Sequence, residues 1–250
     1  MYLWLGPILP LSALVGVHDA GGLTAFVPAG IIHLGLLGLA LLGVTAPAGG
    51  AATMPRVAGG LLVLGSTVVW LGAATFPGMR LEDVASHRAD HWFTSGAFLL
   101  GALISLAGFT LLATLLWDAG ERVLSPLGSV ALLFGTVTWA LHLVFRATIM
   151  VSAAGELTAS GTGAAWYQAL RLWSGAMYAI YMTLAYLATA AFGAAMLKTR
   201  WAGKGWGRIF VIFGFVATVG FLARAGAFDP PLVVQFMPYA MGMLLLRRAV

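Results

Sequence analysis

The sequence predicts an all-α, polytopic transmembrane helix bundle that forms a single integral membrane domain over residues 1–250. Apolar residues make up 61% of the chain, charged residues only 8%, and the mean hydropathy is +0.97. Soluble domains carry about 25% charged residues, so this chain has too little charge to cover a surface that faces water. The composition therefore excludes soluble enzymes, nucleic-acid-binding proteins and disordered chains.

The number of spans follows from the apolar segments, because a membrane helix needs about 20 such residues. The first stretch, 2–17, is short and contains Pro7 and Pro10. Counting it gives about eight helices, and seven is the alternative. The remaining candidate spans are 23–45, 57–76, 91–117, 126–151, 168–197, 208–225 and 232–246.

The connections between these helices are short and rich in glycine, proline or charge. They are predicted at 47–56, 77–90, 152–166 and 198–208. Pro126 fits the first turn of a helix, where its missing N–H has no cost. Pro238 should kink the last helix.

The positive charges predict the orientation of the bundle. With eight spans, one side holds Arg56, Arg122, Lys198, Arg200, Lys204, Arg208, Arg247 and Arg248. The loops on the other side hold only Arg80 and Arg88. By the positive-inside rule the first side is cytoplasmic. Both termini are then expected in the cytoplasm, and the protein in the plasma or bacterial inner membrane.

Two histidines are the strongest candidates for cofactor ligands. His33 lies about ten residues into an inward-running helix, and His142 about nine residues before the external end of an outward-running one. At 1.5 Å per residue their depths are roughly 15 Å and 13 Å. Axial imidazoles at equal depth on facing helices are what bis-histidine ligation of b-type haem requires. Arg146, one turn above His142, would pair with a haem propionate, together with Arg171 and Arg224.

A second candidate site consists of Asp83, His87 and His91. Their spacing of four residues would place them on one face of a helix, where they could hold copper or zinc. The cysteine count is zero, which excludes thiolate metal sites, iron–sulfur clusters and disulfides.

Three function classes remain open. The first is a membrane subunit of an electron-transfer complex that binds b-type haem or a quinone in the outer half of the bilayer. A face formed by Arg171, Ser174, Tyr178 and Tyr181 could line a route for a quinone, a lipid or protons, or it could be a packed helix–helix interface with tyrosine hydroxyl bonds. The second class is a cofactor-free accessory or scaffold subunit, in which each histidine bonds to a hydroxyl on a neighbouring helix. The third is a transporter or metal-handling protein with an external site. The expected partners are the lipid bilayer and other membrane subunits, and no nucleic acid.

Overall fold

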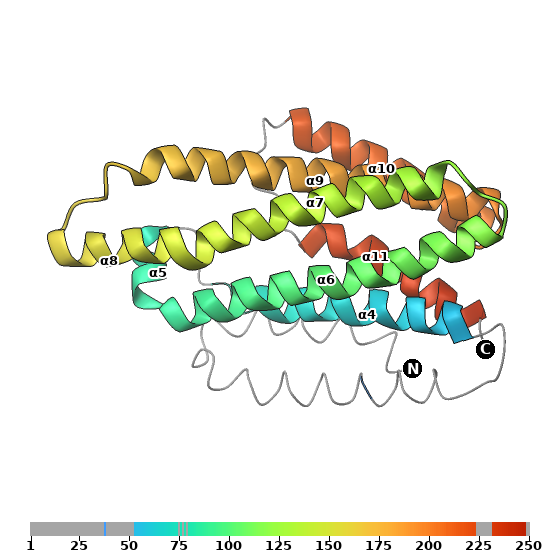
Figure 1. The fold of residues 1–250 in the computed structure, drawn as a ribbon, viewed down its shortest axis with the longest axis horizontal. Coiled ribbons are helices and arrows are strands. Elements are labelled where there is room, and N and C mark those ends of the chain that lie inside the picture. Colours follow the sequence, from blue (N-terminus) through green and yellow to red (C-terminus); the bar gives the residue numbers. More distant parts are fainter. Residues whose placement is uncertain are drawn as a thin grey trace.

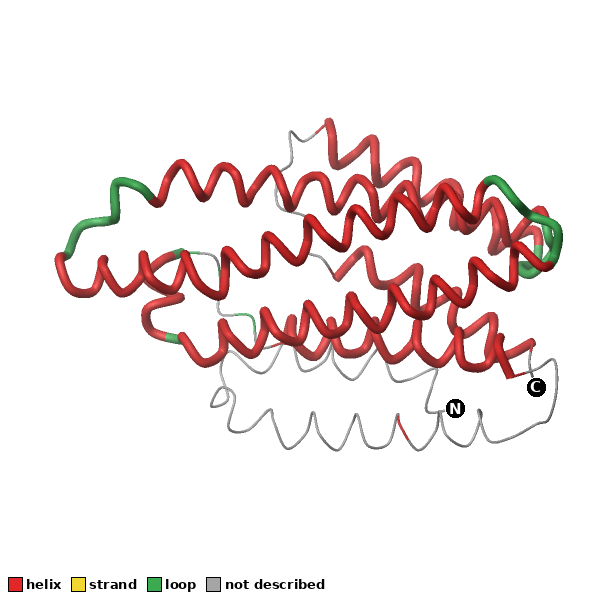
Figure 2. The backbone as a smooth tube through the Cα atoms, in the orientation of Figure 1, coloured by secondary structure: helices red, strands yellow, loops and turns green. Residues whose placement is uncertain are grey.

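The computed structural model describes residues 53–223, except 75, 77 and 79, together with Gly38 and residues 232–248. The predicted spans 2–17 and 23–45 lie outside these residues apart from Gly38, and so do His33 and Arg224. The described part of the chain contains helices and no strand (Figures 1 and 2).

The helices confirm the predicted all-α class. They are α4 (Thr53–Ala74), α5 (Leu81–Ser86), α6 (Arg88–Asp118), α7 (Leu124–Phe145), the π-helical turn η1 (Arg146–Met150), α8 (Val151–Ser160), α9 (Tyr167–Lys198), α10 (Lys204–Ala223) and α11 (Leu232–Arg248). Five helical segments in the described residues are long and apolar enough to cross a membrane. The total of about eight spans and the location of the termini stay predictions.

Two predicted connections contain helix. The segment 152–166 was expected to be a loop, but α7, η1 and α8 run on as one helical segment, Leu124–Ser160. Ala153 and Ala154 are fully buried there, and this burial favours helix over the loop that a small, polar sequence suggests. The segment ends at Gly161, whose φ of +70° suits glycine. The connection 77–90 likewise contains the short helix α5.

Helices α5 and α8 pack together at one end of the bundle and form what we call the outer cap. Its apolar core consists of Val84, Phe145, Met150, Ala153, Ala154 and Tyr167. Figure 1 shows this cap at the end where α4 finishes and α9 begins.

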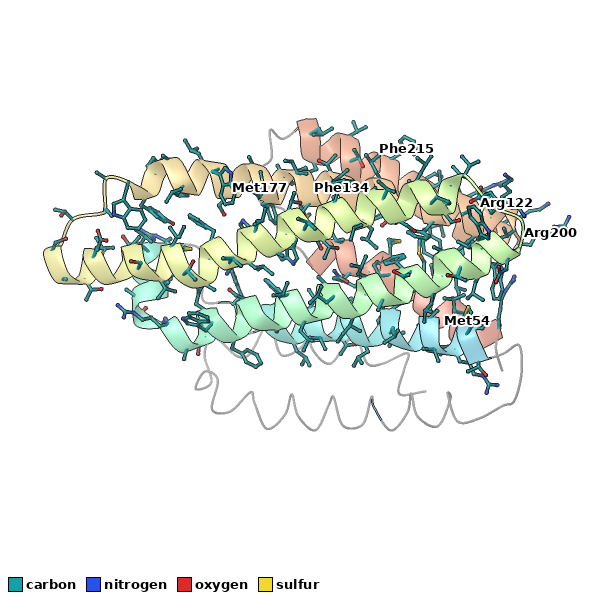
Figure 3. All side chains as sticks on the ribbon, viewed as in Figure 1. Met54, Arg122, Phe134, Met177, Arg200 and Phe215 are labelled. Carbon is teal, nitrogen blue, oxygen red and sulfur yellow. The ribbon has the colours of Figure 1, made fainter. Side chains whose placement is uncertain are left out.

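The spans pack through close backbone contacts. Helix α4 lies between α6 and α11, and α9 lies between α7 and α10. A Cβ atom added at Gly65 would come within 2.7 Å of the carbonyl oxygen of Gly101. Only small residues allow two helices to approach so closely. In contrast, Phe134 on α7 and Phe215 on α10 are 62% and 57% exposed on the outer faces of their helices (Figure 3), as expected for surfaces that face lipid.

The sequence predicts that most basic residues lie on one side of the bundle. Arg122 and Arg200 lie at the end opposite the outer cap, where α6 and α9 finish (Figure 3). Helix α4 begins at this end and α11 finishes there, which adds Arg56, Arg247 and Arg248. The basic residues thus gather at one end of the bundle, as the sequence predicts.

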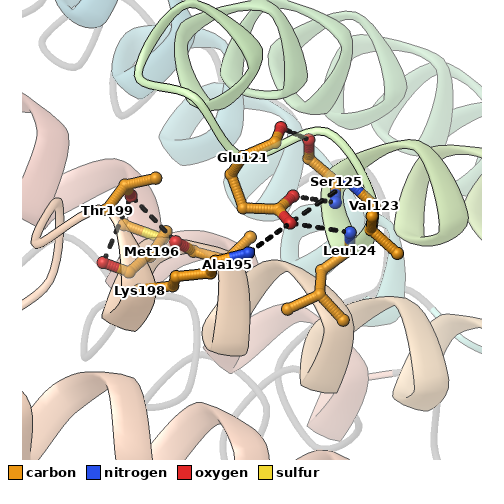
Figure 4. A network of polar contacts seen from close by, with 8 residues as sticks. All are labelled: Glu121, Val123, Leu124, Ser125, Ala195, Met196, Lys198 and Thr199. Atoms are coloured by element: carbon orange, nitrogen blue, oxygen red, sulfur yellow. Dashed lines mark hydrogen bonds and ion pairs between the residues drawn. The ribbon is translucent and has the colours of Figure 1, made fainter.

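A buried carboxylate fixes the α6–α7 turn at this basic end. The Glu121 carboxylate accepts hydrogen bonds from the backbone N–H groups of Val123, Leu124 and Ser125 at 3.2, 3.0 and 2.8 Å. It also lies 3.7 Å from Nζ of Lys198 on α9 (Figure 4). Glu121 therefore caps the start of α7, where backbone N–H groups have no helical partner, and joins it to the end of α9.

Candidate functional site

Three ionisable side chains that are buried in the bundle form the candidate site. His91 comes from the first turn of α6, His142 from the end of α7 and Arg146 from η1. Their exposed fractions are 0%, 4% and 1%. We call these residues the His–Arg cluster. Buried ionisable groups in membrane helices are costly and usually functional.

Helix α9 positions His142. The Nδ1 atom of this ring lies 3.0 Å from the backbone oxygen of Ser174 and 2.8 Å from its Oγ. A carbonyl oxygen can only accept, so Nδ1 carries the proton of the neutral ring and donates it. The Nε2 atom then keeps a lone pair, and it has no hydrogen-bond partner among the described residues.

His91 is held in an equivalent way by η1. Its Nε2 atom donates to the backbone oxygen of Arg146 at 3.0 Å. Its Nδ1 atom is buried and has no partner in the described part of the chain. One helical turn further along α6, the Oγ of Ser95 is also buried without a partner. Both histidines therefore present an unused acceptor nitrogen inside the protein.

Arg146 supplies the complementary donors. Its guanidinium lies over the rings of Phe76 and Phe98, at 4.9 and 6.0 Å from their centroids. Its Nε and Nη2 atoms have no hydrogen-bond partner, and Arg146 makes no ion pair with any described residue. The charge of Arg146 acts on both histidines of the cluster and on Tyr178.

Aromatic rings enclose the His–Arg cluster. Trp139 stacks on the His142 ring, with centroids 5.3 Å apart and an interplanar angle of 15°. Trp139 also stacks on Tyr181 at 4.6 Å, and Tyr178 lies 5.3 Å from His142. These rings pack against His142 and make its surroundings apolar.

The cluster combines hydrogen-bond donors and acceptors that a ligand could use together. The unpartnered N–H groups of Arg146 suit a carbonyl or carboxylate oxygen, and the two free imidazole nitrogens suit a hydroxyl group or a metal ion. Leaving such groups buried and unpaired costs about 1–3 kcal/mol each. A ligand that pairs them would recover this free energy.

The structure brings together some of the residues predicted to bind a cofactor. His142 and Arg146 share the cluster, as their spacing predicts. Arg171 is exposed, and its Nε donates to Oε1 of Gln168 at 3.1 Å, so it lies apart from the cluster. His33 and Arg224 lie outside the described residues.

The predicted metal ligands are not assembled into a site. His87 interrupts the helix between α5 and α6, with φ of −129° and ψ of 48°, so the three residues do not share one helical face. Asp83 lies on α5, and His87 is exposed and bonds to Ser86 Oγ at 2.9 Å. His91 points to Arg146 instead. The described residues contain no group of three or more His, Asp or Glu side chains that could hold a metal ion.

Sequence reasoning missed the link between His91 and η1. Nothing in the spacing of α6 indicates which carbonyl on another helix its histidine contacts. The spacing of His91 and Ser95, four residues apart in a largely apolar segment, is the signal that could have indicated a buried polar face on α6. Comparisons with family models, with curated proteins and with solved structures find no match to this chain.

Proposed function

We propose that the chain is an integral membrane subunit of an electron-transfer complex, and that the His–Arg cluster binds the headgroup of a quinone. The observation that carries this proposal is that the Nε and Nη2 atoms of Arg146 and one ring nitrogen each of His91 and His142 are buried without a hydrogen-bond partner among the described residues.

A quinone ring uses both kinds of group. Its carbonyl oxygens accept hydrogen bonds, which matches the unpartnered N–H groups of Arg146. In the reduced form its hydroxyl groups donate, which matches Nδ1 of His91 and Nε2 of His142. The chain would supply binding and a proton acceptor, while a partner subunit of the complex supplies the electron donor or acceptor.

A b-type haem is the second candidate for the same site. It is favoured by the orientation of His142, because metal-bound histidines usually donate their other N–H to a carbonyl or carboxylate group. Nδ1 of His142 makes such a bond to Ser174, and Nε2 is free to bind iron. Arg146 would then hold a propionate. The second axial ligand in this arrangement is the predicted His33.

One preparation tests both candidates. The protein is purified in mild detergent, its reduced-minus-oxidised visible spectrum is recorded, and organic extracts of the same sample are analysed for quinones. We expect about one quinone per chain and a spectrum without haem bands. A b-type spectrum that disappears in His142→Ala would favour haem instead.

Matched arginine variants show whether the His–Arg cluster is responsible for quinone binding. Hydrogen bonds to charged groups contribute about 1.5–3 kcal/mol, so Arg146→Gln should weaken quinone binding by about tenfold or more. Arg171→Gln, which changes an exposed arginine on α9, should bind as the wild type does. A wild-type protein that contains neither haem nor quinone and does not bind an added short-chain quinone would contradict the proposal.

A further inference from the structure

A second polar region lies between α6, α7, α9 and α11. Its centre is a cavity of about 20 Å³. The polar residues that line it are Ser105, Thr136, Tyr181, Thr189 and Gln235. A site of about 10–15 Å³ is already large enough for one water molecule if two to four polar groups surround it.

Ser105 provides a hydrogen-bonding group that no described residue pairs with. Its side chain is 5% exposed, and its Oγ atom has no partner among the described residues. The hydroxyl groups of Thr136 and Thr189 donate to backbone oxygens of Leu132 and Ala185, at 2.8 and 2.9 Å. Each threonine oxygen can therefore still accept a hydrogen bond in the cavity.

Pro238 adds a second reason for an internal ligand. It lies inside α11 and has no N–H group, so it cannot donate to the carbonyl oxygen of Val234 four residues earlier. Val234 and Pro238 both line the cavity. In membrane helices, carbonyl groups that proline leaves without a donor are often satisfied by ordered water or by hydroxyl side chains.

The cavity also adjoins a polar link between helices. The Ser66 hydroxyl on α4 donates to Oε1 of Gln235 on α11 at 3.3 Å. The Gln235 side chain interacts in turn with the Tyr181 hydroxyl on α9. A molecule in the cavity would connect Ser105 on α6 to this link, so that polar groups from four helices are joined.

We propose that this cavity is a binding site for a single ordered water molecule, held by Ser105 and by the Val234 carbonyl group that Pro238 leaves without its helical donor. The water accepts from or donates to Ser105 Oγ and donates to the Val234 oxygen. It supplies the donor that is missing from the α11 ladder and links α11 to Ser105 on α6. Tyr181 also borders the His–Arg cluster, but neither Ser105 nor Val234 belongs to that cluster, so the proposal does not depend on the quinone.

Radiolytic hydroxyl-radical labelling tests the proposal, because radicals formed from a bound water oxidise the side chains that touch it. The full chain in detergent is irradiated and the oxidised residues are measured by mass spectrometry. Tyr181, which is only 3% exposed, should be labelled several-fold more than Tyr186, which is 1% exposed and does not line the cavity.

Two variants and one control show whether the labelling of Tyr181 depends on the proposed water. Ser105→Ala removes one partner of the water, and Pro238→Ala returns a backbone donor to Val234, so each should reduce labelling of Tyr181 at least twofold. Ser129→Ala on α7 is the control, because Ser129 Oγ donates to its own helix at Ser125. Equal labelling of Tyr181 and Tyr186 in the wild type would overturn the proposal. So would unchanged labelling of Tyr181 in both variants.

Discussion

Replacing Arg146 with methionine should abolish ligand binding without destabilising the ligand-free protein. Burying an arginine in a membrane helix costs about 2.5–3.5 kcal/mol at the bilayer centre and less near the helix end. The cation–π contacts with Phe76 and Phe98 recover about 0.5–2 kcal/mol each. Since Nε and Nη2 have no partner in the part of the chain that the structure describes, few hydrogen bonds are lost on substitution.

The balance of these contributions lies between about 2.5 kcal/mol in favour of the Arg146→Met variant and about 1.5 kcal/mol against it. Methionine fills irregular apolar space well, so we expect a change near zero. Reversible unfolding in mixed detergent micelles measures this free energy. Arg171→Met is the matched control, and a change within about 0.5 kcal/mol is expected at that exposed position. A loss of more than about 2 kcal/mol for Arg146→Met would refute the reasoning, since it would mean that the guanidinium is a paired structural group.

Further predictions concern the ends and interfaces of the helices. Burial acts to raise the pKa of Glu121, but hydrogen bonds from Leu124, Ser125 and Val123 outweigh it and hold the pKa below its ordinary value of 4.5. The Glu121 carboxylate should therefore contribute fully to stability above about pH 4.5, and this contribution should be lost as the pH falls through the lower pKa of the folded state. Glu121→Gln should remove this pH dependence from unfolding titrations. Gly101→Ala should destabilise the protein by about 1–3 kcal/mol, because a Cβ there would lie 2.7 Å from the Gly65 oxygen. Gly96→Ala on the same helix, where a Cβ meets nothing within 4 Å, should be neutral or slightly stabilising; equal losses in both variants would contradict this account of α4–α6 packing.

Much of the fold could be predicted because membrane helices leave a strong pattern in composition. The span 168–197 corresponds to α9, Tyr167–Lys198, and 91–117 to α6, Arg88–Asp118. The extension of α7 through η1 into α8 could not be predicted in this way. Its small residues look like a loop, and only their packing against α5 makes the helix favourable.

The part of the site that lies within one helical segment could be predicted from the sequence. The part that joins two helices could not. The spacing of His142 and Arg146 places both on one face of a single helical segment, and the structure agrees. His91 was assigned to a metal site because its spacing from Asp83 and His87 assumed an unbroken helix. The break at His87 separates them, and the bond from His91 to the Arg146 oxygen depends on how α6 packs against η1.

The outer cap has a consequence for the route by which the proposed quinone would reach the His–Arg cluster. The segment Leu124–Ser160 has 37 residues and is about 55 Å long, which exceeds the roughly 30 Å of the hydrocarbon layer. The segment is therefore longer than one crossing needs, and its far end packs against α5 beyond the position of Arg146. Under the proposed function, we expect the quinone to arrive by lateral diffusion between the spans. Occupancy should follow the mole fraction of ligand in the lipid, so adding empty vesicles should release it, while diluting with buffer should not.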